Sequence, residues 1–231
     1  MICLTASVVH GRDPFVYVSL ANENRIVTYR LNEDTGTLTL ADSLAVNGRP
    51  GALSFHPTLP ILYASIRSAG NLASFRVEET TGKLTLINEI SAGSDPSYLS
   101  VGKSGKLLMS AFYREGKILV HTIKHNGAIS SELQSIATDE RAHAIVSDRT
   151  GRFWFVPHTR PNAIFQFLLD QQTGRLVNNN PTKLQRESNT GPRHLWFHPN
   201  LDIAYSSDEQ GRSVSTYDLD TTRGVLSLKP T

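Results

Sequence analysis

Short runs of apolar residues recur along the chain at a nearly constant interval. The runs are FVYVS (15–19), ILYAS (61–65), LLMSA (107–111), FWFVP (153–157) and IAYSS (203–207), and their central residues are 46, 46, 46 and 50 residues apart. About ten residues after each run, apolar and polar residues alternate, as in RIVTYRL and NLASFRV. Alternation rich in β-branched and aromatic residues predicts β-strands.

Each repeated unit contains two further strands. A glycine-marked turn follows the alternating run in every unit, in EDTGTLTL, ETTGKLTL, KHNGAISS, QQTGRLVN and TTRGVLSL. Glycine supplies the positive φ that a tight hairpin needs, so this turn predicts a third and a fourth strand paired as a hairpin. The segment before each apolar run also aligns, from LTASVVHGRDP (4–14) to PRHLWFHPNLD (192–202), and supplies the first strand.

Four short strands about every 46 residues predict an all-β protein, a β-propeller of four-stranded antiparallel blades. A solenoid of β-coils is the alternative, but its repeats are usually shorter. The chain of 231 residues is expected to form a single domain with five blades. Their approximate bounds are 4–45, 46–91, 92–137, 138–187 and 188–231.

Composition narrows the classes of partner. The 23 basic and 21 acidic residues give a net charge of +2 and are scattered, so no nucleic-acid surface is expected. Cys3 is the single cysteine, which excludes an internal disulfide and fits a cytoplasmic protein. The N-terminal apolar stretch lacks a signal-peptide pattern, and no segment approaches the ~20 apolar residues that would cross a membrane. A small, anionic ligand is the expected partner.

The repeat also tests the stretch GPRHLWFHPN (191–200), because a residue that recurs at its aligned position belongs to the scaffold. His198 and the proline after it recur as His56 and its proline, and His10 aligns with them in the first unit. We expect these histidines to fix a turn.

Arg193 breaks the repeat. Its aligned residues are Thr5, Gly51, Ser97 and His143. The first strand of each blade lies nearest the axis, so Arg193 and His143 are expected to be neighbours around the channel. His194 is the next residue along, and the alternation of side chains on a strand predicts that it points away from them.

Glu209, in SSDEQGRS, is the third departure from the repeat. It aligns with Ala21, Arg67, Tyr113 and Thr159, at the end of the second strand. This carboxylate is either merely solvated or part of an acid/base set with His143 and Arg193, because histidine titrates near neutrality and arginine binds carboxylate or phosphate.

Other chemistry has little support in the sequence. There is no HExxH, GxGxxG, Walker or GxSxG motif. Four aspartates that could crowd a channel and bind calcium fall at different aligned positions; they are Asp95, Asp139, Asp148 and Asp208. The sequence therefore predicts neither a metal nor a cofactor.

The blade pattern YVS…N.I..Y.L....G.LTL and the stretch GPRH…FHPN…AY…DE resemble the seven-bladed propeller lactonase family. That family includes the propeller type of bacterial 6-phosphogluconolactonase and the fungal carboxy-cis,cis-muconate lactonising enzymes. The resemblance extends over essentially the whole chain. It implies that His143 and Glu209 are catalytic and that Arg193 and His194 bind substrate.

The resemblance implies a lactone hydrolase acting on a sugar-acid lactone such as 6-phosphogluconolactone. His143 would be the general base, Glu209 would orient it, Arg193 would bind phosphate or the developing oxyanion, and His194 would contact substrate. The alternatives are cyclisation of a carboxylated muconate and a non-catalytic propeller scaffold or enzyme remnant. Since the family has about seven repeats, we expect a truncated, open ring that can self-associate through exposed blade edges.

Overall fold

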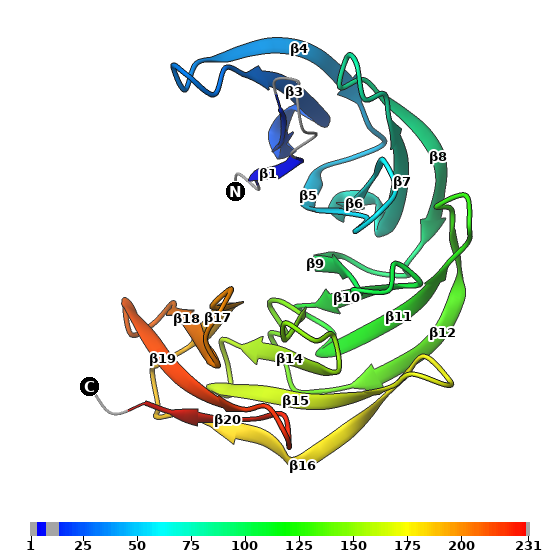
Figure 1. Ribbon diagram of the computed structural model, residues 1–231. Helices are drawn as coiled ribbons and strands as arrows, with labels where there is room; N and C mark the ends of the chain where they lie inside the picture. The colour runs from blue at the N-terminus through cyan, green and yellow to red at the C-terminus, as the bar shows by residue number, and fades with distance from the viewer. Residues whose placement is uncertain (1–3, 8–13, 230–231) are drawn as a thin grey trace.

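The computed structural model describes residues 4–7 and 14–229. Within them the chain forms five four-stranded antiparallel sheets, and in each sheet the strands are paired in sequence order. This confirms the all-β fold of propeller blades. The sheets follow one another along an arc whose two ends are the first and the fifth sheet (Figure 1). The expected open ring is thus seen as an open arc.

The strands of the first three sheets and two short 3-10 helices have the following bounds. They are β1 (Leu4–Ser7), β2 (Phe15–Leu20), β3 (Arg25–Leu31), β4 (Leu38–Ala45), β5 (Pro50–Phe55), β6 (Ile61–Ile66), β7 (Asn71–Val77), β8 (Leu84–Ser91), β9 (Pro96–Val101), β10 (Leu107–Phe112), β11 (Lys117–Ile123) and β12 (Ile129–Ala137), with η1 (Ala21–Glu23) and η2 (Arg67–Ala69).

The fourth and fifth sheets complete the series. Their strands are β13 (Val146–Ser147), β14 (Phe153–His158), β15 (Ala163–Asp170), β16 (Arg175–Gln185), β17 (Pro192–Phe197), β18 (Ile203–Asp208), β19 (Ser213–Asp220) and β20 (Val225–Leu228). The first strands line the concave side of the arc, and the long fourth strands β4, β8, β12 and β16 form its convex side (Figure 1).

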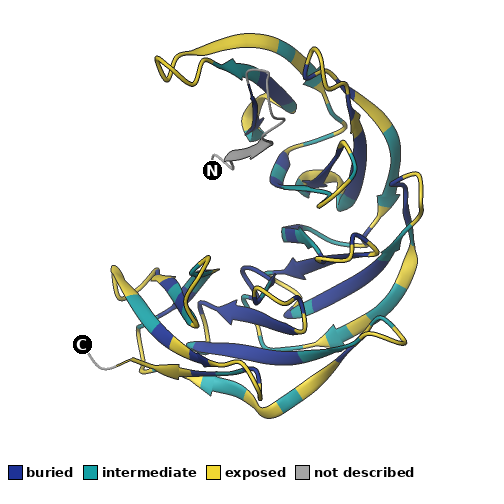
Figure 2. Cartoon of the chain, in the orientation of Figure 1, coloured by how far each residue is buried: buried dark blue, intermediate teal, exposed yellow. Residues whose placement is uncertain are grey.

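The core consists of apolar layers between neighbouring sheets. In β6, Leu62, Ala64 and Ile66 pack with residues of the first sheet, whereas Ile61 and Tyr63 pack with residues of the third. A strand buried on both faces needs apolar residues at every position. This explains why the second strand of each unit is a continuous apolar run, while the convex strands are largely exposed (Figure 2).

The turn glycines are constrained by the neighbouring sheet as well as by their backbone. Gly82 and Gly127 have φ of 71° and 83°. Their carbonyl oxygens accept hydrogen bonds from Tyr17 Oη (2.8 Å) and Tyr63 Oη (2.9 Å) of the preceding sheet. A Cβ on Gly127 would overlap the side chain of Ile61. Each hairpin turn is therefore locked against the sheet before it.

Two first strands depart from the sequence alignment. In the first sheet Thr5 pairs with Tyr17. In the second sheet the residue equivalent to Tyr17 is Tyr63, and it pairs with Ser54. Thr5 therefore corresponds to Ser54 and not to Gly51, a shift of three positions from the expected alignment. His10 lies outside the described residues. In the fourth sheet β13 has only two residues, and Ala142 forms an isolated bridge before it.

The outward face of the fifth sheet exposes apolar side chains. Trp196 is 70% exposed and Val214 is 69% exposed. Tyr205 is only half-buried, although its counterparts Tyr17 and Tyr63 are completely buried against the following sheet. Since neighbouring sheets pack face to face, the apolar surface at this end of the arc is a sheet face, and not the strand edge expected from the sequence.

Candidate functional site

A cavity of about 210 Å³ opens at the ends of the first strands. It is lined by Arg67, Ser97, Tyr113, His143, Arg193 and Glu209. These residues come from two positions of the repeat: Ser97 and Arg193 lie at the start of a first strand and His143 at the aligned position three residues before β13, whereas Arg67, Tyr113 and Glu209 lie directly after a second strand. Antiparallel pairing brings the two positions together, as between Pro192 and Asp208, which immediately precede Arg193 and Glu209. The predicted neighbours His143, Arg193 and Glu209 are thus in one cavity.

Arg193, predicted to bind substrate, connects the two predicted catalytic residues, His143 and Glu209. Its Nε donates a hydrogen bond to His143 Nε2 (2.8 Å) and lies 3.0 Å from Glu209 Oε2. Within the described part of the chain, its two terminal nitrogens make no hydrogen bond. A guanidinium fixed through Nε keeps both terminal nitrogens available for an anion, which they can bind in a bidentate manner.

His143 is a buried, neutral imidazole. Its Nε2 accepts the hydrogen bond from Arg193, so the ring proton is on Nδ1, which is buried and has no hydrogen-bond partner among residues 14–229. The ring of Tyr113 packs edge-on at 5.7 Å. Burial, followed by the positive charge of Arg193, lowers the pKa of His143 to about 3. At neutral pH the imidazole is uncharged and a weak base.

His194 turns toward His143, contrary to the expectation from side-chain alternation. Its ring lies 4.8 Å from that of His143 and 5.9 Å from that of Tyr98. The cause is an irregularity in β17, where the pairing with β18 shifts between Pro192 and His194. His194 does not line the cavity. Its packing supports the imidazole of His143, so direct contact with substrate is not favoured by this geometry.

The backbone around Glu209 is held by the preceding sheet. The N–H of Glu209 donates to the carbonyl of Gly191 (2.8 Å), and the N–H of Gly191 donates to Asn162 Oδ1 (2.8 Å). Asn162 has a φ of 65°, a left-handed conformation that asparagine tolerates. These bonds connect the β14–β15 turn to the start of β17 and to the residue after β18, and so position both Arg193 and Glu209.

Arg67 and Tyr113 line the cavity but were not among the predicted site residues. Arg67 forms a bidentate ion pair with Asp95, from Nε to Oδ1 (2.8 Å) and from Nη2 to Oδ2 (2.9 Å). The signal for both residues was present in the sequence, because they align with Glu209. The chemically different side chains at that position concealed their shared location.

His198 has the structural role expected of it. Its Nδ1 accepts hydrogen bonds from the N–H groups of Asn200 (3.1 Å) and Leu201 (2.9 Å). Nδ1 of His56 accepts the same pair of bonds, from the N–H groups two and three residues further along. The turn-fixing role is therefore confirmed, and neither histidine lines the cavity.

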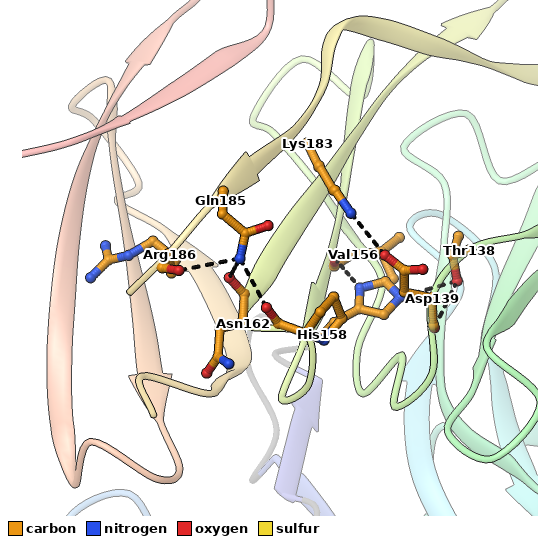
Figure 3. Close-up of polar contacts among 9 residues, drawn as sticks. Thr138, Asp139, Val156, His158, Asn162, Lys183, Gln185 and Arg186 are labelled. Carbon is orange, nitrogen blue, oxygen red and sulfur yellow. Dashed lines mark hydrogen bonds and ion pairs between the residues drawn. The ribbon is translucent and has the colours of Figure 1, made fainter. Parts of the chain in front are cut away.

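Another buried histidine, His158, lies between the third and fourth sheets (Figure 3). Its Nδ1 bonds the carbonyl of Val156 (2.9 Å), and its Nε2 bonds Thr138 Oγ1 (3.0 Å). At the edge of this cluster Lys183 Nζ lies 2.9 Å from Asp139 Oδ2. Burial lowers the pKa of His158 to about 4. Both ring nitrogens are satisfied in the neutral form, so His158 holds the two sheets together.

The described residues contain no group of three or more histidine, cysteine, aspartate or glutamate side chains that could bind a metal ion. Two of the four aspartates considered as calcium ligands are ion-paired, Asp95 with Arg67 and Asp139 with Lys183. No helix in residues 4–7 and 14–229 is long and apolar enough to cross a membrane. The ionisable side chains that line the cavity are a carboxylate, an imidazole and two guanidinium groups.

Comparison with known proteins gives one family match and several relatives. The family described as "Lactonase, 7-bladed beta-propeller" matches residues 9–231. The 6-phosphogluconolactonase of Erwinia tasmaniensis is 32% identical over 117 residues, covering 51% of this chain and 35% of that protein. The enzyme of the same name from Klebsiella pneumoniae is 26% identical over 224 residues, covering 97% of this chain and 53% of that protein.

The fold has counterparts among solved structures. The periplasmic gluconolactonase of Pseudomonas aeruginosa superposes with a TM-score of 0.83 at 20% identity, covering 99% of this chain and 67% of that one. At this level of identity the likeness concerns the fold. Relative to the two curated proteins above, the chain spans about half the length of one and about a third of the other.

Proposed function

Because the chain belongs to the seven-bladed β-propeller lactonase family, we propose that it hydrolyses a sugar-acid lactone, with 6-phosphogluconolactone as the leading substrate. The observation that carries the proposal is the bridge from Arg193 to both His143 and Glu209 inside one cavity. The names of the curated relatives, which align with half or more of the chain, support this choice of substrate.

Hydrolysis makes three demands on these residues. A water molecule adds through its oxygen to the lactone carbonyl carbon and loses a proton to a base. The carbonyl oxygen becomes an oxyanion, which the terminal nitrogens of Arg193 would stabilise. The bond from this carbon to the ring oxygen then breaks, the ring oxygen takes a proton and becomes a hydroxyl, and the carboxylic acid product ionises.

Two observations favour Glu209 over His143 as the group that takes the proton from water. The Nε2 lone pair of His143 is occupied by Arg193, and a pKa near 3 makes the imidazole a weak base at neutral pH. Glu209 is 41% exposed and contacts Arg193 through Oε2, so Oε1 is available to a water molecule. We assign His143 the role of accepting the hydrogen bond that orients Arg193. Both predicted catalytic residues therefore have a role in the proposed hydrolysis.

Hydrolysis of 6-phosphogluconolactone by the purified chain tests the function. Proton release, followed with a pH indicator and corrected for spontaneous hydrolysis, is expected to exceed that of Arg193→Ala by at least 100-fold, because one oxyanion donor contributes about that much. His143→Ala is expected to be impaired as well. Equal rates for the wild type and both variants would refute the proposal and favour a binding scaffold.

The reverse chemistry, cyclisation of a carboxylated muconate, is the second candidate. It would use Arg193 to bind a substrate carboxylate instead of a phosphate or oxyanion. Loss of muconate absorbance in the presence of the chain, without lactone hydrolysis, would favour it. Hydrolysis is preferred because both curated relatives described above carry the name of a hydrolase.

We also propose that copies of the chain, in the cytoplasm, associate through the ends of the arc. The support is the outward face of the fifth sheet, where Trp196 and Val214 are about 70% exposed. Sedimentation of wild type and Trp196→Ser over a concentration series is the test, and the variant is expected to remain monomeric at concentrations where the wild type associates. Concentration-independent sedimentation of the wild type would contradict it.

A further inference from the structure

We propose that Arg67 selects phosphorylated lactones by binding the substrate phosphate in the cavity that it shares with Arg193 and Glu209. This inference rests on the proposed function and adds to it the residue that determines specificity. In 6-phosphoglucono-1,5-lactone the carbonyl carbon and the carbon that carries the phosphate arm are both bonded to the ring oxygen, and the phosphorus is about five bonds from the carbonyl carbon. A second cationic group in the same small cavity can therefore bind the phosphate while Arg193 faces the reacting carbon.

The charged residues that line the cavity fall into two groups that are held by different partners. His143, Arg193 and Glu209 come from the fourth and fifth sheets and contact one another. Arg67, which follows β6, belongs to the second sheet, and its ion-pair partner is Asp95, in the loop before β9. Arg67 is thus held by a group outside the set that binds Arg193. It is also near enough for its charge to contribute to the lowered pKa of His143.

The ion pair orients Arg67 and leaves part of the guanidinium unused. Nε and Nη2 are both bound by the carboxylate of Asp95, while Nη1 has no hydrogen bond or ion pair in the described part of the chain. The side chain is 35% exposed and lines the cavity. Asp95 and Glu209 balance the charges of Arg67 and Arg193, so the donor that remains for a phosphate oxygen at this place is Nη1 of Arg67.

Gly51 provides the space that Arg67 occupies. A Cβ built on Gly51 would lie 2.7 Å from Cδ and 2.9 Å from Cγ of Arg67, closer than carbon atoms pack. Gly51 is absent from the residues with positive φ, so its backbone conformation does not require glycine. At the same position of the repeat, Ser97, His143 and Arg193 carry side chains. The missing side chain at position 51 therefore lets Arg67 lie across the first strand and reach the cavity.

Kinetics on two substrates test the assignment. For Arg67→Ala we expect the KM for 6-phosphogluconolactone to rise at least tenfold with kcat nearly unchanged, because charge-assisted hydrogen bonds to the phosphate are lost. Hydrolysis of the unphosphorylated glucono-1,5-lactone is expected to change less than twofold. Arg76→Ala, an exposed arginine on β7, is the matched control and should behave as wild type on both substrates.

Gly51→Ala provides a second, independent variant. The added methyl group would lie 2.7 Å from both Arg67 Cδ and Ser65 Oγ. It displaces the stem of Arg67 as well as the Ser65 hydroxyl, so the same selective rise in KM is expected although the arginine is still present. Unfolding curves establish that each variant is folded, and if Arg67→Ala is not, Gly51→Ala carries the test. An equal effect on both lactones, or no effect on either, would overturn the assignment.

The failure of this inference can be separated from the failure of the proposed function. If the wild type hydrolyses neither lactone, the hydrolase proposal fails, and calorimetric binding of 6-phosphogluconate and of gluconate then tests Arg67 directly. A preference for the phosphorylated acid that Arg67→Ala removes would support the phosphate site. The absence of such a preference in the wild type would refute it.

Discussion

Glu209→Gln is expected to lower kcat for lactone hydrolysis by a factor of about 100 to 10,000, the usual contribution of a general base. Glutamine has nearly the same shape, and its carbonyl oxygen can still face Arg193 Nε, 3.0 Å from the present Oε2. It cannot accept a proton from water, so KM should change little. Steady-state kinetics at pH 7 measure both constants.

The matched control is Glu187→Gln, an exposed glutamate in the loop before β17, which should leave kcat unchanged. His143→Gln separates the two assigned roles, because a glutamine carbonyl can accept the hydrogen bond from Arg193 but cannot act as a base. We expect less than a tenfold loss for His143→Gln. A loss as large as that of Glu209→Gln, or a Glu209→Gln enzyme within threefold of the wild type, would contradict the assignment of the base.

Acidification from pH 7 to pH 4 is expected to destabilise the fold by about 3 kcal/mol through His158 alone. The pKa of His158 is about 4 in the folded protein, whereas a free histidine has a pKa of about 6.5. Between these values the unfolded chain binds more protons, so the free energy of unfolding falls as the pH falls from about 6.5 to about 4. His158 is completely buried, so solvent screening does not reduce this contribution.

Urea unfolding at several pH values between 7.5 and 4 measures this effect. His158→Gln is expected to have a flatter dependence of unfolding free energy on pH, whatever its stability at pH 7.5. His143, with a pKa near 3, lowers the unfolding free energy over the same range and on to about pH 3 in both proteins, so the His158→Gln slope becomes flatter but does not vanish. His125→Gln removes an exposed histidine and should keep the wild-type slope. Identical slopes for the wild type and His158→Gln would contradict the prediction.

The position of the candidate site residues was predictable because the chain repeats. Aligned residues of neighbouring blades occupy equivalent places around the axis, so the alignment of His143 with Arg193 was sufficient to predict their contact. The turn histidine His198 could be separated from the site by the same comparison. The open arc followed from five repeats in a family whose members have about seven.

Other features depend on local sterics that an alignment does not contain. His194 faces His143 because the pairing of β17 with β18 shifts between Pro192 and His194. No residue in this stretch indicates that shift in the sequence. Arg67 reaches the cavity only because a glycine sixteen residues earlier leaves room for it. The weak basicity of His143 arises from burial and from the bond with Arg193, so the choice between two bases required the folded geometry.

The residues that line the cavity come from only two aligned positions of the repeat, so the chemistry of the cavity is set by a small number of side chains. The second to the fifth blade each have two such positions sixteen residues apart, namely 51 and 67, 97 and 113, 143 and 159, and 193 and 209, and the six residues that line the cavity come from these positions. The main-chain pairing beside each pair and the apolar layers between sheets involve other residues. Side chains at these positions can therefore be exchanged with little effect on the pairing of the strands. We expect a combinatorial library at these eight positions to yield variants with altered substrate preference in directed evolution.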